Sequence, residues 1–301
     1  MGIRRRIRKS IILPILTLSY LFGLGSYEIL NFPKDSRSLS LNNSASAYNY
    51  PILRNNPAAL YVNSERITYS FLLLPADIQI CEIQKINNIN NNVHVKKISF
   101  INYGSIVDSK TNDSHSAFDL LFEFGYKKEY ENITSIGIST GYLFSSISSF
   151  QSHLFFMNLG VRSRLMKKRM GLGFSLENFP IAIKSYTKHD EIPPSIFRTA
   201  FYYKPLYVPI IINLDIKKYL YNNIIGFSGG FEFKPAKRVT IRIGSRWNVL
   251  NSSNKYFSYH ILANLSGGCG FKFKTFNLDI GFMNLKSSGY VTGLSIWKNI
   301  D

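Results

Sequence analysis

Apolar and polar residues alternate with a period of two along most of the chain after Ile67. That period is typical of β-strands, in which successive side chains point to opposite faces of the sheet. The segment Phe118–Tyr126 is the clearest case, because its aromatic residues occupy one face while Asp119 and Glu123 occupy the other. The pattern therefore indicates strands whose two faces meet different environments.

The alternation predicts about fourteen strands, mostly of about 8–12 residues, joined by a mixture of short turns and longer polar loops. Pro75-Ala76 and Pro235-Ala236 are expected to form short turns. Asn178 to Pro194 is expected to form a long loop. The expected strands are Ile67–Leu74, Asp77–Gln84, His94–Tyr103, Phe118–Tyr126, Thr134–Phe144, His153–Leu165, Met170–Leu176, Ile196–Lys204, Ile210–Tyr219, Ile224–Lys234, Arg238–Arg246, Tyr259–Lys272, Phe276–Met283 and Val291–Lys298.

No apolar run after residue 26 is long enough to form a transmembrane helix, which needs about 18 or more apolar residues. An exported protein that enters a membrane without helices must form a closed barrel, because unpaired sheet edges are too costly in hydrocarbon. Bacterial barrels have even strand numbers and tilted strands of about 9–11 residues. We therefore expect an all-β fold, a transmembrane antiparallel β-barrel of about fourteen strands. A soluble β-sandwich is the competing interpretation.

The N-terminal part of the chain is organised differently. Residues 1–26 combine a basic start, an apolar core over Ile11–Leu24 and small residues near a cleavage point, which predicts a signal peptide; the alternative is a short membrane anchor. Residues 27–60 are expected to form a plug or periplasmic segment, or else a flexible tail. Residues 61–301 are then the outer-membrane barrel.

A proline corner lies where this segment meets the barrel. Pro57 fixes its own φ and pushes Asn56 towards an extended conformation, and Ala58 is small enough to lie against other protein. Asn56, Pro57 and Ala58 are therefore predicted to form the corner of the plug, although an ordinary loop before a strand would show the same residues.

Composition supports the membrane interpretation. The chain is 45% hydrophobic and 15% aromatic with 23 Phe and 19 Tyr, and only 18% of its residues are charged, against about 25% in typical soluble domains. The net charge is +18, and five basic residues fall within the first nine positions. A basic surface suits phosphorylated lipid headgroups, so outer-membrane lipid and lipopolysaccharide are expected partners. Nucleic acid is not expected, because no nucleic-acid motif is present.

Nothing in the sequence points to catalysis. The five histidines are dispersed, and GxSxG, HExxH and P-loop patterns are all absent. We expect no enzyme activity, no cofactor and no metal site. Cys81 and Cys269 lack CxxC spacing, which leaves one long-range disulfide or two free thiols as alternatives.

Several charged residues lie on strand faces opposite apolar residues, and a charge on the lipid face near the midplane costs about 2–4 kcal/mol. They are therefore predicted to face the lumen, where the basic residues either pair with carboxylates or attract anions into a pore. The predicted lumen charges are Asp119, Glu123, Arg162, Arg164, Glu177, Glu232, Arg238, Arg242 and Arg246.

A set of short motifs runs in order over nearly the whole chain after residue 26. The motifs are Tyr27–Pro33 with Ser36-Arg37, Asn56–Leu60, Ile101–Gly104, Ser116–Asp119, Gly173–Asn178, Ile192–Ser195, Gly230–Phe233 with Arg242–Gly244, and Gly268–Phe271. This ordered set resembles the PorV/PorQ family of outer-membrane barrels, which is related to the FadL transporters, and the likeness is closer to the PorQ branch. Two positions depart from the family pattern: Asn42-Asn43 replaces a usual Gly-Gly, and the chain ends in Trp297–Asp301 rather than on an aromatic residue.

The resemblance implies a FadL-like barrel with an N-terminal plug and a non-enzymatic role in the type IX protein secretion system. There it would anchor the cell-surface attachment complex with a PorZ-like partner. The alternative is a FadL-like channel for hydrophobic small molecules. A channel requires an apolar path that leads to a gap in the wall, whereas a scaffold requires a filled lumen and an exposed patch for a partner.

Overall fold

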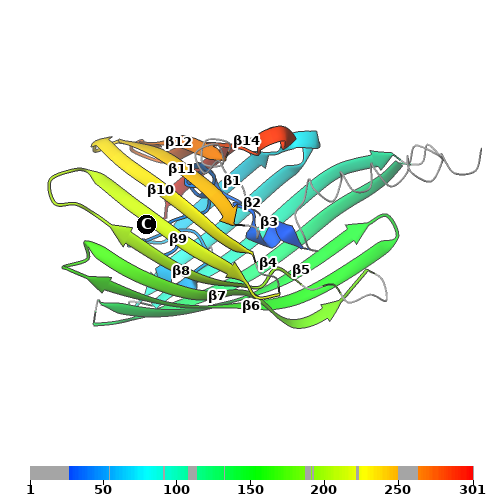
Figure 1. The fold of residues 1–301 in the computed structure, drawn as a ribbon, viewed down its shortest axis with the longest axis horizontal. Coiled ribbons are helices and arrows are strands. Elements are labelled where there is room, and N and C mark those ends of the chain that lie inside the picture. Colours follow the sequence, from blue (N-terminus) through cyan, green and yellow to red (C-terminus); the bar gives the residue numbers. More distant parts are fainter. Residues whose placement is uncertain are drawn as a thin grey trace, which may run out of the picture.

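The structure is a computed structural model that describes residues 27–53, 55–90, 92–107, 114–131, 133–186, 191, 193–221, 224–249 and 264–300. The described residues form one closed antiparallel barrel of fourteen strands, in which every strand pairs with its sequence neighbours (Figure 1). The predicted fold class is confirmed, and the soluble sandwich is wrong. The signal peptide predicted for residues 1–26 lies outside the described residues.

The strands follow one another around the barrel in chain order. They are β1 (Arg66–Leu73), β2 (Gln79–Ile89), β3 (Asn92–Val107), β4 (Ser114–Tyr130), β5 (Thr134–Ile147), β6 (Phe150–Leu165), β7 (Met170–Lys184), β8 (Ile196–Tyr203), β9 (Ile210–Tyr219), β10 (Ile225–Ala236), β11 (Val239–Val249), β12 (Leu265–Lys272), β13 (Asn277–Asn284) and β14 (Tyr290–Asn299). The short helices are η1 (Glu28–Asn31), α2 (Ser36–Ser40), η2 (Pro57–Ala59), η3 (Pro75–Asp77) and η4 (Lys286–Ser288).

Pairing between β1 and β14 closes the ring. The ladder runs without interruption from the pair Arg66 and Asn299 to the pair Leu73 and Thr292. Closure gives the backbone N–H and C=O groups of the first and last strands their partners, which an apolar surrounding cannot supply.

Side chains alternate between the two faces of the wall. On β4, Phe124 is 56% exposed on the outer face, whereas its neighbour Glu123 is 7% exposed on the inner face. Apolar residues dominate the outer face of the other strands as well, among them Leu159, Phe174 and Leu214. This outer surface suits hydrocarbon and the inner surface does not. No helix in the described ranges is long and apolar enough to cross a membrane.

Five neighbouring strands, β3 to β7, are longer than predicted and have 14 to 17 residues. Strand β7 continues to Lys184 through residues that were expected to form a loop. Beyond Glu177, β7 pairs with β6 but no longer with β8, so one of its edges is free there. A free edge tolerates Pro180, which lacks a backbone donor.

The barrel has two unlike ends. The two longest connections, β7–β8 and β11–β12, share one end with the β3–β4 connection, and this end is called here the long-loop end. The opposite end, called the short-turn end, carries the β2–β3, β4–β5, β6–β7, β8–β9, β10–β11 and β12–β13 turns and the end of β14. Short periplasmic turns and longer outer loops are usual in bacterial barrels.

Residues 27–65, called here the N-terminal segment, lie inside the ring of strands, where the blue part of the ribbon is seen (Figure 1). Helix α2 contacts β11 to β14 and β1, while η2 contacts β4 to β7 on other strands of the ring. Contacts with so much of the wall are possible only from within the lumen.

A left-handed turn follows α2. Asn42 and Asn43 have φ values of 50° and 60°, a conformation that asparagine tolerates better than other residues with a side chain. The asparagine pair therefore supports the turn for which Gly-Gly is usual in the resembling family. The Asn43 amide also donates to the carbonyl of Asn31 at 3.0 Å, which joins the turn to η1.

A charge on the middle of the outer face should destabilise the barrel. Leu159 lies near the centre of β6 on the outer face, and Leu165 lies on the same face at the short-turn end. We expect Leu159→Lys to lower the free energy of unfolding by about 2–4 kcal/mol and Leu165→Lys by about 1 kcal/mol or less. Urea unfolding in lipid vesicles measures both, and equal effects would contradict a membrane-spanning wall.

Candidate functional site in the barrel lumen

Most of the predicted lumen charges lie on the inner face and are almost fully buried. Arg246 is half-buried, opposite the inward-facing Ser228. Two predictions need correction here. Pro235-Ala236 do not form the turn, because β10 continues through them, and the turn is Lys237-Arg238, so Arg238 is exposed outside the lumen. The buried charges are Asp119, Glu123, Arg162, Arg164, Glu177, Glu232 and Arg242, none of them more than 7% exposed.

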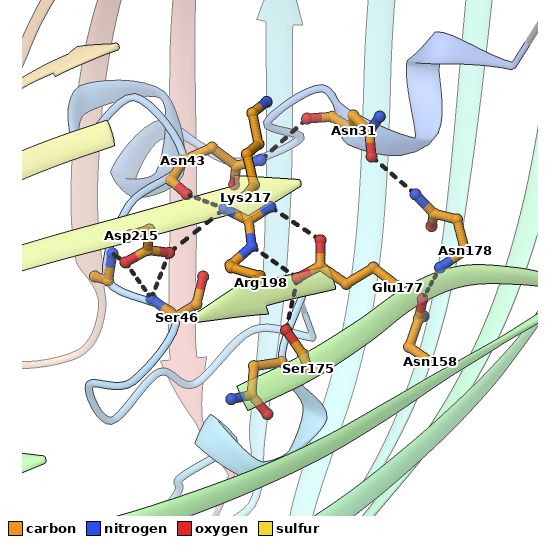
Figure 2. Close-up of polar contacts among 12 residues, drawn as sticks. Asn31, Asn43, Ser46, Asn158, Ser175, Glu177, Asn178, Arg198, Asp215 and Lys217 are labelled. Atoms are coloured by element: carbon orange, nitrogen blue, oxygen red, sulfur yellow. Dashed lines mark hydrogen bonds and ion pairs between the residues drawn. The ribbon is translucent and has the colours of Figure 1, made fainter. Parts of the chain in front are cut away.

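Arg198 on β8 joins one group of these charges to the N-terminal segment (Figure 2). Its guanidinium donates to both oxygens of Glu177, at 2.7 and 2.9 Å, and to Asp215 at 3.4 Å. Asp215 in turn accepts the backbone N–H of Ala45 at 3.1 Å, and the Arg198 Nη1 donates to the Asn43 carbonyl. Wall and segment therefore share one hydrogen-bond network.

A second group crosses the lumen through Arg37 of α2. Arg37 donates to both oxygens of Glu232, at 2.6 and 3.0 Å. Arg242 bridges Glu232 at 3.1 Å and Asp279 at 2.6 Å. Although burial disfavours charge on Arg37, the Glu232 carboxylate raises the Arg37 pKa above its ordinary value, so the guanidinium stays protonated in this pair.

A third group surrounds Lys97 on β3. Its ammonium lies 2.5 Å from Glu123 and 3.6 Å from Glu82, and it donates to the Leu53 carbonyl of the N-terminal segment at 3.1 Å. A cavity of about 30 Å³ adjoins this group, which is room for about two water molecules. Burial lowers the pKa of the adjacent Lys34 to about 8, and the nearby Lys97 charge acts in the same direction.

A fourth group lies nearer the short-turn end. Glu129 pairs with both Lys127 and Arg164. Arg162 donates to the Asn49 side chain at 2.6 Å and to Ser135 at 3.2 Å. Asp119 stands apart and accepts from Tyr103 at 2.7 Å and from Ser145. Each of the seven buried charges thus has a polar partner at contact distance among the described residues.

Sequence reasoning missed several members of these groups. Arg198 and Asp215 alternate with outward-facing Phe197 and Leu214, so strand periodicity could have placed both in the lumen. Arg37 could not be found in this way, because it belongs to a helix in a polar segment. Its role depends on where that helix lies in the lumen.

The predicted corner packs against one glycine on each of three adjacent strands, Gly137 on β5, Gly160 on β6 and Gly173 on β7. Asn56 caps η2 by accepting the Ala58 N–H at 3.0 Å, and its φ of −108° is extended, as expected before proline. Gly137 and Gly160 leave no room for a side chain: an added Cβ would lie 2.4 Å from the Ala58 nitrogen at the former and 2.0 Å from the Asn56 oxygen at the latter. The corner therefore lies flush against the wall.

The inner face is apolar towards the long-loop end. Leu72, Ile80, Ile101 and Val291 form one buried cluster with Met283 and with residues of the nearby turns. Leu121, Leu143, Leu154 and Phe156 form a second. Both clusters are packed against the N-terminal segment, through Ile29, Phe32 and Leu39 in the first and Leu30 in the second. The two clusters are called here the apolar layer.

Strand β3 is irregular beside the apolar layer. The β3–β4 register shifts between Asn102 and Ser105, and Gly104 has a φ of 75°. The Asn102 side chain accepts the Gly104 N–H at 3.0 Å, which satisfies a donor of the bulge locally. The wall is therefore bent next to Ile101 and Tyr103, which belong to or pack against the layer.

Metal and thiol chemistry add little to this site. Within the described ranges, no group of three or more His, Cys, Asp and Glu residues could hold a metal ion. Cys81 and Cys269 are free thiols on β2 and β12, and Cys81 is exposed on the outer face.

Filling the seat of the corner should loosen the N-terminal segment. In Gly160→Ala, the new methyl group meets Asn56 and Pro57, whereas in Gly267→Ala the nearest atom is 3.6 Å away. We expect Gly160→Ala to reduce unfolding free energy by about 1–3 kcal/mol through overpacking. In the same urea titration, Gly267→Ala should have an unfolding free energy near that of the wild type. An equal loss in both variants would contradict a close contact between the corner and Gly160.

Removing the Arg198 guanidinium should lower the free energy of unfolding by more than the glycine substitution does. In Arg198→Gln, Glu177 and Asp215 remain buried without their guanidinium partner, a change that typically costs about 3–5 kcal/mol. We expect the loss in urea unfolding and faster proteolysis of residues 27–65 in folded protein. The control Arg238→Gln changes the same residue type in an exposed turn, and it should change neither measurement.

Comparison with known proteins shows what this architecture is similar to. No family model and no curated protein sequence matches the chain. Among solved structures, the toluene transporter TodX of Pseudomonas putida aligns with a TM-score of 0.68 at 13% identity, over 93% of this chain and 100% of TodX. The monoaromatic hydrocarbon channel CymD aligns with a TM-score of 0.65 at 13% identity, over 93% and 98% of the two chains.

A FadL homologue of Pseudomonas aeruginosa also aligns, with a TM-score of 0.55 at 10% identity, over 90% of this chain and 99% of the homologue. At such identities the likeness concerns the fold. The resemblance to the PorV/PorQ branch and to type IX secretion stays a prediction. The closed fourteen-stranded barrel of this chain is thus similar in fold to TodX and to the FadL homologue along nearly its whole length.

Proposed function

We propose that this protein is a non-enzymatic outer-membrane channel for hydrophobic small molecules. The observation that carries the proposal is the apolar layer on the inner face, beside the bulge of β3. An apolar solute gains free energy from leaving water for such a lining, at about 25 cal/mol per Å² buried, and gains none among ion pairs. The fold likeness to a toluene transporter and a monoaromatic hydrocarbon channel supports the same reading.

The structure corresponds to a closed state of that channel. Ile29, Leu30 and Phe32 of the N-terminal segment occupy the space against which the apolar layer packs. A hydrophobic molecule therefore enters only when η1 and the residues after it move aside, while the charged groups nearer the short-turn end hold the rest of the segment in place. Export by the predicted signal peptide and residence in the outer membrane belong to the same proposal.

One observation favours a second function, a PorQ-like scaffold of the type IX secretion system. The charged half of the lumen is filled, and its cavity of about 30 Å³ is lined largely by polar residues such as Lys34, Glu82 and Lys97. A filled barrel suits a protein that anchors a cell-surface complex through a PorZ-like partner. The ordered motifs of the PorQ branch support this alternative.

An uptake assay tests the channel. Cells that lack their own hydrophobic-compound channel would express the protein and take up radiolabelled toluene or oleate. Ile101→Gln places an amide in the apolar layer, while Ile98→Gln on the same strand faces outward. We expect Ile101→Gln to reduce uptake several-fold and Ile98→Gln to leave it unchanged at equal surface expression.

Tagged protein isolated from outer membranes separates the two functions. Uptake no greater than with an empty vector would refute the channel. Co-purification of secretion components in that case supports the scaffold, and recovery of the barrel without such components refutes the scaffold.

A further inference from the structure

Four turns at the short-turn end carry an unbalanced positive charge. They comprise residues 166–169, 204–209, 237–238 and 273–276, and together they contain seven basic residues and no acidic one. Because they join β6–β7, β8–β9, β10–β11 and β12–β13, which follow one another around the barrel, the turns lie along one arc of the rim. This set of turns is called here the basic arc.

The cations of the basic arc have no carboxylate partners among the described residues. The ion pairs of the described residues lie in the lumen, apart from one between Lys85 and Glu65, and none involves these seven side chains. Like charges so close together repel one another unless counter-charges neutralise them. The arc therefore favours an anionic surface.

Large apolar residues are interleaved with these cations. Tyr207 is 92% exposed, and Met166, Leu206 and Phe273 are each more than half exposed. A hollow beside the β6–β7 turn is lined by the apolar Ile133, Leu165 and Met166. Its charged lining residues are Arg164, Lys167 and Lys168 and one carboxylate, Glu131 of the neighbouring β4–β5 turn. Apolar side chains alternating with cations suit the boundary between acyl chains and headgroups, where rings and aliphatic groups insert and cations meet phosphate.

Hydrogen bonds to backbone carbonyls hold two of the turns in place. Lys204 donates its N–H to the Arg169 carbonyl at 2.7 Å, and the Arg169 Nε donates to the Lys204 carbonyl at 3.3 Å, so two of the turns are joined. The Tyr202 hydroxyl donates to the Lys168 carbonyl at 3.2 Å. The cations of the β6–β7 turn thus project from a fixed loop.

We propose that the basic arc binds the headgroups of acidic phospholipids in the leaflet that surrounds the short-turn end. The arc lies at the edge of the apolar outer face, so lipid phosphates reach it in the plane of the membrane. If the arc bound a soluble acidic protein through its cations, the exposed apolar residues of the arc would remain in water. Lipid acyl chains would cover these residues, which favours a lipid as the partner. The site is separate from the lumen and holds for either proposed function.

Lipid binding to the purified full-length protein in detergent tests the proposal. Native mass spectrometry would follow titrations with phosphatidylglycerol and with phosphatidylcholine of the same acyl chains. We expect phosphatidylglycerol to bind about tenfold or more tightly, because each cation near an anionic surface contributes to binding. The triple variant Lys167→Gln, Lys168→Gln and Arg169→Gln should lose most of that preference.

The matched control removes three exposed cations from the opposite half of the barrel, in Lys184→Gln, Lys218→Gln and Lys286→Gln. It has the same net charge as the first variant and should keep the preference. Equal loss in both variants, or no preference in the wild type, would overturn the proposal. So would full displacement of the lipid by glycerol phosphate, which points to a free-anion site, or by polyglutamate, which points to an acidic protein.

Discussion

Pairing between β1 and β14 is the constraint on which the rest of the structure depends. In hydrocarbon, an open edge leaves backbone donors and acceptors without partners, so the sheet has to return to its own first strand. Once the ring closes, each strand has an outer face against apolar surroundings and an inner face that no longer meets bulk solvent freely. The alternation of Phe124 with Glu123 follows from that division.

The inner face then needs partners for its charges, and the N-terminal segment supplies many of them. Arg37, the Asn43 and Leu53 carbonyls and the Asn49 side chain each contact a charged residue of the wall. A buried charge that loses its partner is costly, so these contacts specify the position of the segment more sharply than apolar packing does. The apolar layer at the long-loop end lacks such contacts and is the part best able to rearrange around a ligand.

Periodicity in the sequence was sufficient for the strand number, the closed barrel and the direction of most strand charges. It was insufficient where the tertiary context decides. Strand β7 continues through Pro180 because its ladder with β8 has already ended. Arg238 lies outside the lumen because β10 continues through Pro235-Ala236 and the turn comes two residues later than the proline predicts. The partners of Glu232 and Arg162 come partly from residues 27–65. The backbone of this segment is irregular, so no alternation of polar and apolar residues predicts where its side chains lie.

The glycine seats have a consequence for the order of assembly. Gly137 and Gly244 would each bring an added Cβ to 2.4 Å from the backbone of the N-terminal segment, and α2 and η2 together contact most of the strands. So little clearance leaves almost no room for a folded segment to slide along a closed barrel. We therefore expect the segment to be in place before β1 and β14 pair and close the ring.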